Sequence, residues 1–207
     1  GISLKDFPVG DGFVDIEMTE LESKFNVNIA DSELLRQILT TMGVDAGEIS
    51  EVADSIQDWV DPDDATKPAG AESDFYQGMT PAYYAKNAPI DDIQELQFIK
   101  GVTPEMFKGG AANPNSPYKK HRLGFGAGHG DSADYLFGLR DVLTAFSSGK
   151  VNVNTASSNV LACIPLMDGV SVDGILKFRD SAGDTMTGNG VINNLGQLQA
   201  VIPNPQA

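Results

Sequence analysis

The stretch KVNVNTASSNVL, at residues 150–161, repeats a phrase that occurs earlier in the chain as KFNVNIADSELL, at residues 24–35. Seven of the twelve positions are identical, and the two copies are offset by 126 positions. The register continues without a gap, so that Gly43 of the first copy corresponds to Gly169 of the second. A repeat at a fixed offset indicates one structural unit built twice.

The pattern after each repeated phrase predicts two helices joined by a turn. In the first copy, the apolar residues of each predicted helix keep the spacing of a single helical face. The first helix carries Leu34, Leu35, Ile38, Leu39 and Met42, and the second carries Ile49, Val52, Ile56, Trp59 and Val60. Asp31 or Ser32 can cap the first helix and Asp45 the second. Gly43 suits the left-handed position between them. In the second copy Ser157 or Ser158 takes the capping position.

The clearest β signal precedes the first copy. Residues 13–18 and 25–29 alternate polar with apolar side chains, which is typical of half-buried strands, and we expect the two segments to form a hairpin. The paired asparagines of the repeat, Asn152 and Asn154 in the second copy, can satisfy backbone groups where an extended segment enters a helix. We therefore interpret them as fold residues rather than ligands.

The remaining segments are mixed. Residues 61–89, rich in Pro and Gly, are predicted to be loop, and residues 111–130 are predicted to be irregular. Helices are predicted at 91–99, where Asp91 and Gln94 are spaced as a capping box, at 135–146, and over a short turn at 195–201.

Composition excludes several classes of protein. The chain has 207 residues and a formal net charge of −15, whereas nucleic-acid backbones attract Lys and Arg. The densest basic stretch, residues 119–122, is too small to reverse this balance. No apolar run approaches the roughly 20 residues that span a bilayer. The single cysteine, Cys163, cannot form an internal disulfide and is interpreted as a small buried hydrophobe.

The usual catalytic patterns are poorly represented. The only two histidines, His121 and His129, lie in a glycine-rich segment, which gives neither a rigid Ser-His-Asp arrangement nor a zinc-ligand pair. The stretch GFGAGHG, at residues 124–130, fails the spacing of nucleotide-binding loops because His129 occupies a required glycine position. An enzyme built on this segment stays a weak alternative.

The most informative chemistry is the acidic stretch DWVDPDDATKPAGAE, at residues 58–72. Its five carboxylates repel one another unless solvent or a cation screens them, and they are Asp58, Asp61, Asp63, Asp64 and Glu72. Hard oxygen ligands on a loop suit Ca²⁺, which takes about 6 to 8 oxygens. The spacing is not that of an EF-hand. From these residues alone, a calcium site and a solvated acidic loop are equally supported.

The repeat resembles helix-hairpin-helix modules, known from competence DNA receptors and repair proteins. The resemblance implies that the turns at Gly43 and Gly169 would face DNA phosphate. However, Asp45 and Asp168 place negative charge beside these turns. A competence-type DNA-binding module is therefore the alternative reading of the chain, and electrostatics disfavour it.

A more extensive resemblance covers residues 13 to about 203. In order, the chain carries K-h-N-h-N at 24–28, D-W-h-D-x-D at 58–63, G-A-E at 70–72, a Tyr-rich stretch and N-x-P at 87–89, E-L-x-x-h-x-G at 95–101, and N-h-N-T-A at 152–156. In these motifs the chain is similar to the type II secretion system protein K family, the large minor pseudopilins.

This resemblance implies a mainly α protein with a small β part. The helical domain would be helix-hairpin-helix-like (SAM-like) and attached to an incomplete pilin-like sheet. We expect three segments: a β hairpin at 1–29 as the pilin-like remnant, the first helical unit with the acidic loop at 30–148, and the second helical unit at 149–207.

The resemblance also implies a function without catalysis. Family members cap the tip of a periplasmic pseudopilus together with minor pseudopilins I and J, and a secreted protein is a further candidate partner. We expect this chain to be the periplasmic domain of an inner-membrane-anchored protein whose N-terminal membrane helix is absent here. Because family members have been seen with calcium in the helical domain, the resemblance favours Ca²⁺ at Asp58, Asp61, Asp63, Asp64 and Glu72.

Overall fold

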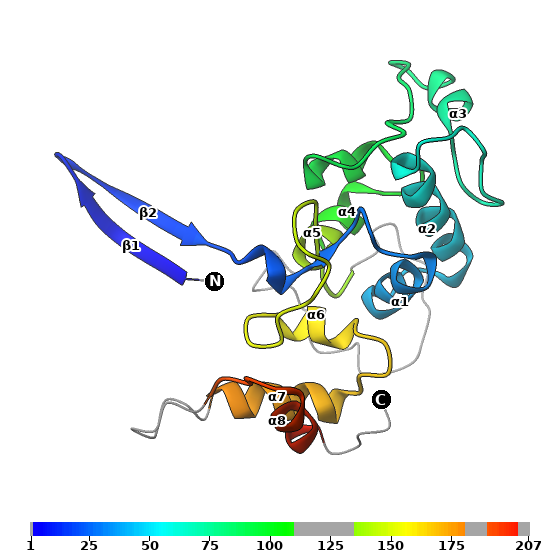
Figure 1. Ribbon diagram of the computed structural model, residues 1–207. Coiled ribbons are helices and arrows are strands. Elements are labelled where there is room, and N and C mark those ends of the chain that lie inside the picture. Colours follow the sequence, from blue (N-terminus) through cyan, green and yellow to red (C-terminus); the bar gives the residue numbers. More distant parts are fainter. Residues whose placement is uncertain (1, 110–134, 181–189, 203–207) are drawn as a thin grey trace. The chain divides into compact units, whose positions relative to one another are not determined.

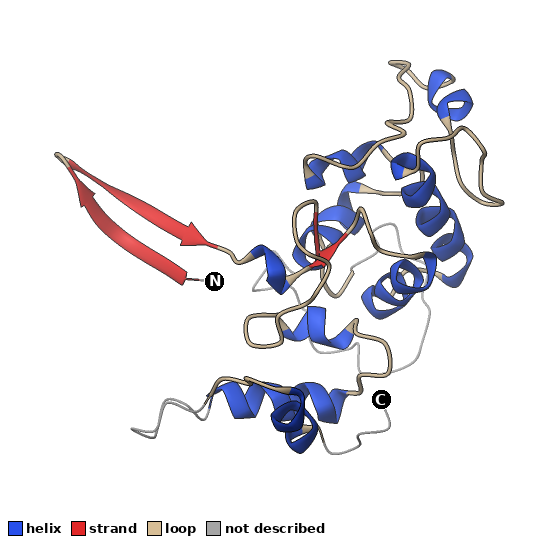
Figure 2. Cartoon of the chain, viewed as in Figure 1, coloured by secondary structure: helices blue, strands red, loops and turns tan. Residues whose placement is uncertain are grey.

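The chain forms two compact units of helices with a small amount of β structure (Figures 1 and 2). The structure, a computed structural model, describes residues 2–109, 135–180 and 190–202. One unit comprises residues 27–145, and the other combines residues 1–26 with 146–207. The expected mainly α fold with a small β part is confirmed. The expected segment bounds at 29/30 and 148/149 stay a prediction.

The unit of residues 27–145 is built on the first predicted helix pair. Helix α1 (Ser32–Met42) begins at Asp31, whose side chain accepts a hydrogen bond from the Leu34 N–H, and ends at Gly43 with φ 88°. That left-handed angle is readily available to glycine. Helix α2 (Ala46–Val60) is capped by Asp45, as predicted. The two helices bury the predicted apolar faces, including Leu35, Ile38, Leu39 and Met42 of α1 and Val52, Ile56 and Trp59 of α2.

Four short elements complete the helical part of this unit. They are α3 (Ser73–Gln77), the 3-10 helix η2 (Ile93–Phe98), α4 (Pro104–Lys108) and α5 (Leu139–Val142). Helix α3 lies in the segment that the sequence predicted to be loop, and its five residues are too short to carry a helical period. The predicted capping box is one residue out of place, because Asp92 and Glu95 make it rather than Asp91 and Gln94.

The predicted helix at 135–146 is wrong over most of its length. Only α5 is helical, and strand β4 (Leu143–Thr144) follows it directly. The reason is tertiary: the Val27 N–H donates to the Thr144 carbonyl at 3.0 Å, and the Asn28 side chain donates to the Ala145 carbonyl at 3.1 Å. These bonds hold residues 144 and 145 extended, although the spacing of apolar residues over 135–146 suits a helix.

The other unit begins with an antiparallel hairpin. Strand β1 (Ile2–Val9) pairs with β2 (Gly12–Met18) in a register that sets Val9 opposite Gly12. The sequence correctly located β2 but assigned it the wrong partner, since residues 25–29 contribute only the short strand β3 (Phe25–Asn26). The two-residue connection at Gly10 and Asp11, with Gly10 at φ 59°, is the tight type that favours a hairpin between neighbouring strands. The prediction of a half-buried strand was also wrong, because every residue of β2 is exposed.

The second helix pair belongs to this same unit. After the 3-10 helix η1 (Leu21–Ser23) and β3, the chain returns at residue 146 and forms α6 (Ser158–Ala162), α7 (Gly169–Asp180) and α8 (Leu195–Val201). Ser157 caps α6 by accepting a hydrogen bond from the Val160 N–H. Helices α7 and α8 pack closely, since a Cβ on Gly174 would lie 2.6 Å from the Val201 carbonyl oxygen. In the described ranges, no helix combines the length and apolarity that a bilayer crossing requires.

The repeated asparagines make the same contact in both units. Asn28 donates to the Ile90 carbonyl at 3.0 Å and accepts from the Ile90 N–H at 2.7 Å. Asn154 does the same with Ile192, at 3.0 Å and 2.7 Å. The sequence prediction that the Asn154 side chain satisfies backbone groups is confirmed. We call each of these pairs an asparagine clamp.

The clamps reveal a third part of the repeat. Residues 90–96, IDDIQEL, correspond to residues 192–198, INNLGQL. In the first copy the Glu95 carboxylate accepts from the Asp91 N–H at 2.9 Å, and in the second the Gln197 side chain accepts from the Asn193 N–H at 2.7 Å. Each repeat is therefore a helix pair plus a capped helical turn. The sequence comparison missed the third part because its offset is 102 positions rather than 126.

Candidate metal centre

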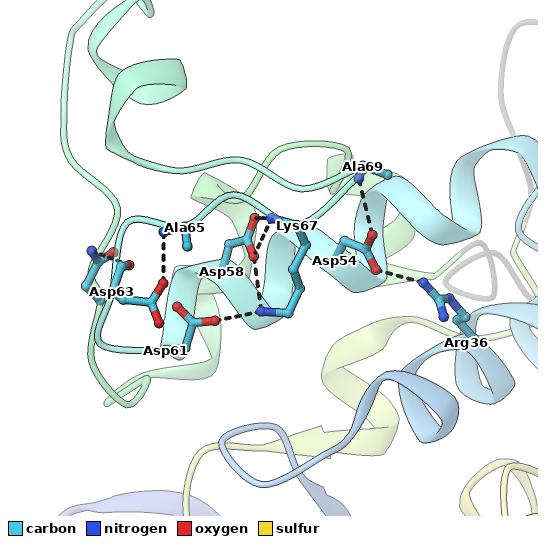
Figure 3. A network of polar contacts seen from close by, with 9 residues as sticks. Arg36, Asp54, Asp58, Asp61, Asp63, Ala65, Lys67 and Ala69 are labelled. Atoms are coloured by element: carbon cyan, nitrogen blue, oxygen red, sulfur yellow. Dashed lines mark hydrogen bonds and ion pairs between the residues drawn. The ribbon is translucent and has the colours of Figure 1, made fainter.

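Two buried carboxylates of α2 hold the later part of the acidic segment, residues 58–72, against the helix (Figure 3). Asp54 accepts from the Ala69 N–H at 3.2 Å and pairs with Arg36 at 2.7 Å. Asp58 lies one helical turn later, and both of its oxygens accept from the Lys67 N–H, at 3.3 and 3.1 Å. Side chains four residues apart share a helix face, so together they hold residues 67–69 along α2.

Gly70 is required for this arrangement. A Cβ at Gly70 would lie 1.9 Å from the Oδ2 atom of Asp58, far inside van der Waals contact. The G-A-E motif therefore has a steric reason: its glycine lets the chain pass over Asp58. Two residues later Glu72 enters the interior and forms the N-cap of α3.

Three of the predicted ligands come together next to these hydrogen-bonded residues of α2. One carboxylate oxygen each of Asp61, Asp63 and Glu72 lies within 4.8 Å of the others. Asp63 also accepts from the Ala65 N–H at 2.8 Å, which shapes the turn that carries it. We call these three residues the acidic cluster. Carboxylates at such separations can share one cation.

Glu72 is the unusual member of the acidic cluster. Its side chain is buried, and neither carboxylate oxygen has a hydrogen-bond partner. Burial, followed by the charges of Asp58 and Asp61, raises the pKa of Glu72 to about 7. Leaving an ionised carboxylate buried and unpaired is costly, so the group needs either a proton or a cation. The Oδ1 atom of Asp61 is also buried without a partner.

The other two predicted ligands have partners of their own. Asp58 is fully buried, and burial raises its pKa while the bonds from Lys67 oppose that rise. Asp64 accepts from the Asn87 side chain at 2.9 Å. Neither belongs to the acidic cluster, so their predicted role as ligands stays a prediction.

Asn87 is a functional candidate that the sequence reasoning did not single out as a ligand. Its amide N–H groups also donate to the Asp63 carbonyl at 2.9 Å, and its Oδ1 atom is buried without a partner. Its backbone has φ 47°, which is uncommon outside glycine but better tolerated by asparagine. The N-x-P motif was the available signal, and its asparagine contacts Asp63, a member of the acidic cluster, through its amide nitrogen.

Lys67 partly balances the charge. Its Nζ atom lies 2.7 Å from an Asp61 oxygen and 3.3 Å from an Asp58 oxygen, and the hydrogen bond to Asp61 is the main cause that raises the pKa of the lysine. One ammonium cannot neutralise Asp58, Asp61, Asp63 and Glu72 together. The surplus of anionic and amide oxygens fits a hard cation such as Ca²⁺, whereas zinc sites use histidine and cysteine, neither of which is part of this cluster.

The helical turns of the repeat carry carboxylates where a phosphate would bind. Asp45 accepts from the Gly47 N–H at 2.9 Å, and Asp168 accepts from the Ser171 N–H at 2.7 Å. Hydrogen bonds from Ser171 lower the pKa of Asp168, which keeps it ionised. Because these carboxylates already use the N–H groups at the helix starts, the geometry disfavours the DNA-binding alternative. His121 and His129 lie outside the described residues.

Comparison with known proteins finds relatives of the segment that contains the acidic cluster. Residues 17–109 match the model of the type II secretion system (T2SS), protein K. The chain is 30% identical to the type II secretion system protein K of Aeromonas hydrophila over 120 residues, which cover 49% of this chain and 36% of that protein. Over residues 17–109 the chain is therefore similar to the type II secretion system protein K family. The acidic cluster and Asn87 both lie inside the matched range.

Other protein K relatives extend the likeness. The Pseudomonas aeruginosa protein K is 27% identical over 149 residues, covering 72% of this chain and 36% of that protein. The chain thus spans about a third of the length of these curated relatives. A solved GspK-GspI-GspJ complex from enterotoxigenic Escherichia coli contains a chain of the same fold, with a TM-score of 0.61 and 17% identity, covering 97% of this chain and 62% of that one. This likeness concerns the fold alone, and it agrees with the mainly α fold that the sequence motifs indicated.

Proposed function

We propose that the chain is part of a minor pseudopilin of the type II secretion system. It would act at the tip of a periplasmic pseudopilus, in a protein anchored in the inner membrane, together with minor pseudopilins I and J. The observation that carries the proposal is the likeness in fold, over 97% of this chain, to a chain of the solved GspK-GspI-GspJ complex. The family match over residues 17–109 supports it.

The proposed role is structural and without catalysis. The duplicated helical unit would supply bulk, because a subunit that carries two helix pairs in addition to a strand hairpin would not pack into a narrow helical shaft and would be restricted to an end. The exposed apolar side chains of the hairpin, including Phe7 and Phe13, suit a role at a subunit interface, since contiguous exposed apolar surface marks interaction sites. A secreted protein would be a further partner.

Co-expression tests the assembly. The chain would be produced with pseudopilins I and J of the same secretion system and examined by size-exclusion chromatography with light scattering. We expect one stable complex with one copy of each protein. Elution of the chain alone, while I and J remain together, would contradict the proposal.

We also propose that the acidic cluster binds Ca²⁺. Asp61, Asp63 and Glu72 would supply carboxylate oxygens and Asn87 its orphaned amide oxygen, with Asp58 and Asp64 as additional predicted ligands. The buried Glu72 carboxylate, whose two oxygens have no donor, carries this proposal. Bound calcium would neutralise the segment and connect its two ends, near Asp61 and Glu72, which would stabilise the folded chain by linkage. Isothermal titration of the calcium-free chain tests it, and heat of binding that is absent in the Glu72→Gln variant is expected.

A further inference from the structure

An apolar depression lies beside helix α3, in the unit of residues 27–145 (α3 is labelled in Figure 1). Three large apolar side chains line it and remain exposed to solvent: Phe75 at 41%, Met79 at 45% and Phe98 at 57%. Tyr76, Tyr83, Gln97 and residues 99–102 complete the lining. We call this surface the aromatic groove. Clustered exposed apolar side chains of this kind mark interaction sites more often than scattered ones do.

The floor of the aromatic groove is fixed by buried rings. Tyr76 is fully buried, contacts Trp59 edge-on at 5.2 Å between ring centroids, and stacks on Tyr83 at the same distance. The Tyr83 hydroxyl donates to the Phe98 carbonyl at 2.7 Å, and the Tyr76 hydroxyl accepts from the Lys100 N–H at 3.2 Å. Two walls of the groove are therefore tied to one aromatic core, so a ligand would meet a preformed surface.

Lys100, the cation at the aromatic groove, already has several partners. Lys100 Nζ donates to the Ala69 and Gly70 carbonyls, both at 3.3 Å, and lies 3.4 Å from a Glu51 oxygen. It also lies 5.3 Å from the centroid of the Phe75 ring. Asp74, the exposed neighbour of Phe75, adds negative charge on α3. The two carboxylates, Glu51 beside Lys100 and Asp74 next to Phe75 in the sequence, thus outnumber the one cation of the lining.

The size of the groove indicates what fits. Its volume is about 230 Å³, below the roughly 300–1,000 Å³ of typical pockets for small-molecule ligands. One or two side chains of a peptide fill such a space. Because the chain carries a net charge of −15, charge complementarity favours a basic segment and opposes an acidic one.

We propose that the aromatic groove is a docking site for a segment of another protein that presents a large apolar side chain flanked by lysine or arginine. The apolar side chain would contact Phe75, Met79 and Phe98, and the flanking cations would face Glu51 and Asp74. None of the lining residues belongs to the acidic cluster, so the peptide test can be made in chelator, without calcium.

Three labelled peptides test the proposal on the 207-residue chain by fluorescence anisotropy. The peptide KKLFKKG carries both features, KKAAKKG lacks the apolar side chains, and EELFEEG reverses the charge. We expect KKLFKKG to bind at least tenfold more tightly than either of the others. Equal affinity for KKAAKKG would reduce the interaction to charge alone and overturn the proposal, as would an equal or higher affinity for EELFEEG or no binding of KKLFKKG at millimolar concentration.

Matched variants locate the site. Phe98→Ala should weaken binding of KKLFKKG at least fivefold, because Phe98 is exposed and lines the groove. Leu195→Ala removes a large apolar side chain that is 67% exposed on helix α8, outside the groove lining, and should leave the affinity within a factor of two. Circular dichroism would establish that both variants are folded, and Phe75→Ala serves in place of Phe98→Ala if the latter is not. Affinity that is unchanged in the folded groove variant would contradict the docking site.

Discussion

Asn28 holds both backbone polar groups of Ile90, which lies 62 residues further along the chain, and Asn154 holds those of Ile192 in the same way. A two-way contact of this kind fixes the position of a capped helical turn beside a helix pair. Its recurrence in two units is the structural basis of the duplicated sequence phrase.

Removing the clamp should destabilise the unit of residues 27–145. Asn28→Ala leaves the Ile90 N–H and the carbonyls of Ile90 and Ala145 without a side-chain partner, and each unsatisfied buried group costs about 1–3 kcal/mol. Because Asn28 is only partly buried, water replaces some of these bonds, and we expect a loss of about 1–3 kcal/mol in the free energy of unfolding. Urea denaturation measures it.

The control for this substitution is Asn193→Ala. Asn193 is exposed, and its side-chain N–H donates only to the carbonyl of nearby Val191, so this change should cost less than about 0.5 kcal/mol. A free energy of unfolding for Asn28→Ala that matches this control would show that the clamp is dispensable.

Gly70→Ala should detach the acidic segment from α2. The new methyl group would lie 1.9 Å from an Asp58 oxygen, and either the loop or the buried carboxylate has to move. We expect a loss of about 1–3 kcal/mol in unfolding free energy together with weaker calcium binding, because Glu72 is only two residues away. Gly169→Ala is the control, since a Cβ there meets nothing within 4 Å; equal melting temperatures for the two variants would contradict the steric account.

The raised pKa of Glu72 predicts how stability depends on pH in the presence of a chelator. The folded chain holds the Glu72 proton up to a pH of about 7, compared with 4.5 for an ordinary glutamate. Between these values the folded state binds more protons than the unfolded state, so the free energy of unfolding falls as pH rises. The loss attributable to Glu72 is about 1–3 kcal/mol. Urea denaturation between pH 4.5 and 7.5 measures this slope, and Glu72→Gln should flatten it; a parental slope retained in the variant would assign the effect to other groups.

Calcium should stabilise the chain at neutral pH by replacing that proton. At a concentration 100 times its dissociation constant, a ligand adds about 2.7 kcal/mol, which corresponds to a rise of roughly 5–10 °C in melting temperature for a chain of this size. We expect this rise in the parent and in Asp74→Asn, whose exposed carboxylate lies outside the acidic cluster, but not in Glu72→Gln. Melting temperatures in calcium and in chelator measure it, and a parent indifferent to both would contradict the metal centre.

Sequence reasoning succeeded where the controlling interactions are local. Asp31, Gly43, Asp45 and Ser157 act within one turn of their own helix, so their capping roles were visible in the sequence. The hairpin was misassigned because strand pairing depends on which segments meet in the fold. The alternation of residues 13–18 identifies a strand but does not show which other strand pairs with it. The helix predicted at 135–146 failed for a similar reason, since Asn28, more than 100 residues away, holds its end extended.

The acidic segment was recognised from its composition, but the sequence did not show which of its carboxylates have hydrogen-bond partners and which do not. Asp58 and Glu72 are equivalent in a count of carboxylates, yet Asp58 accepts backbone hydrogen bonds and Glu72 has none. That difference depends on how the loop folds back over Gly70. Asn87 was missed as a ligand candidate because it lies 15 residues beyond Glu72 and reaches the segment only through the tertiary fold.

We propose above that the protein containing this chain caps one end of a secretion pseudopilus through its bulk. Gold labelling with an antibody against the unit of residues 27–145, viewed by electron microscopy on isolated pseudopili, tests it most directly. The account predicts gold at a single end of each filament. Gold distributed along the shaft, or filaments with no gold at either end, would contradict it.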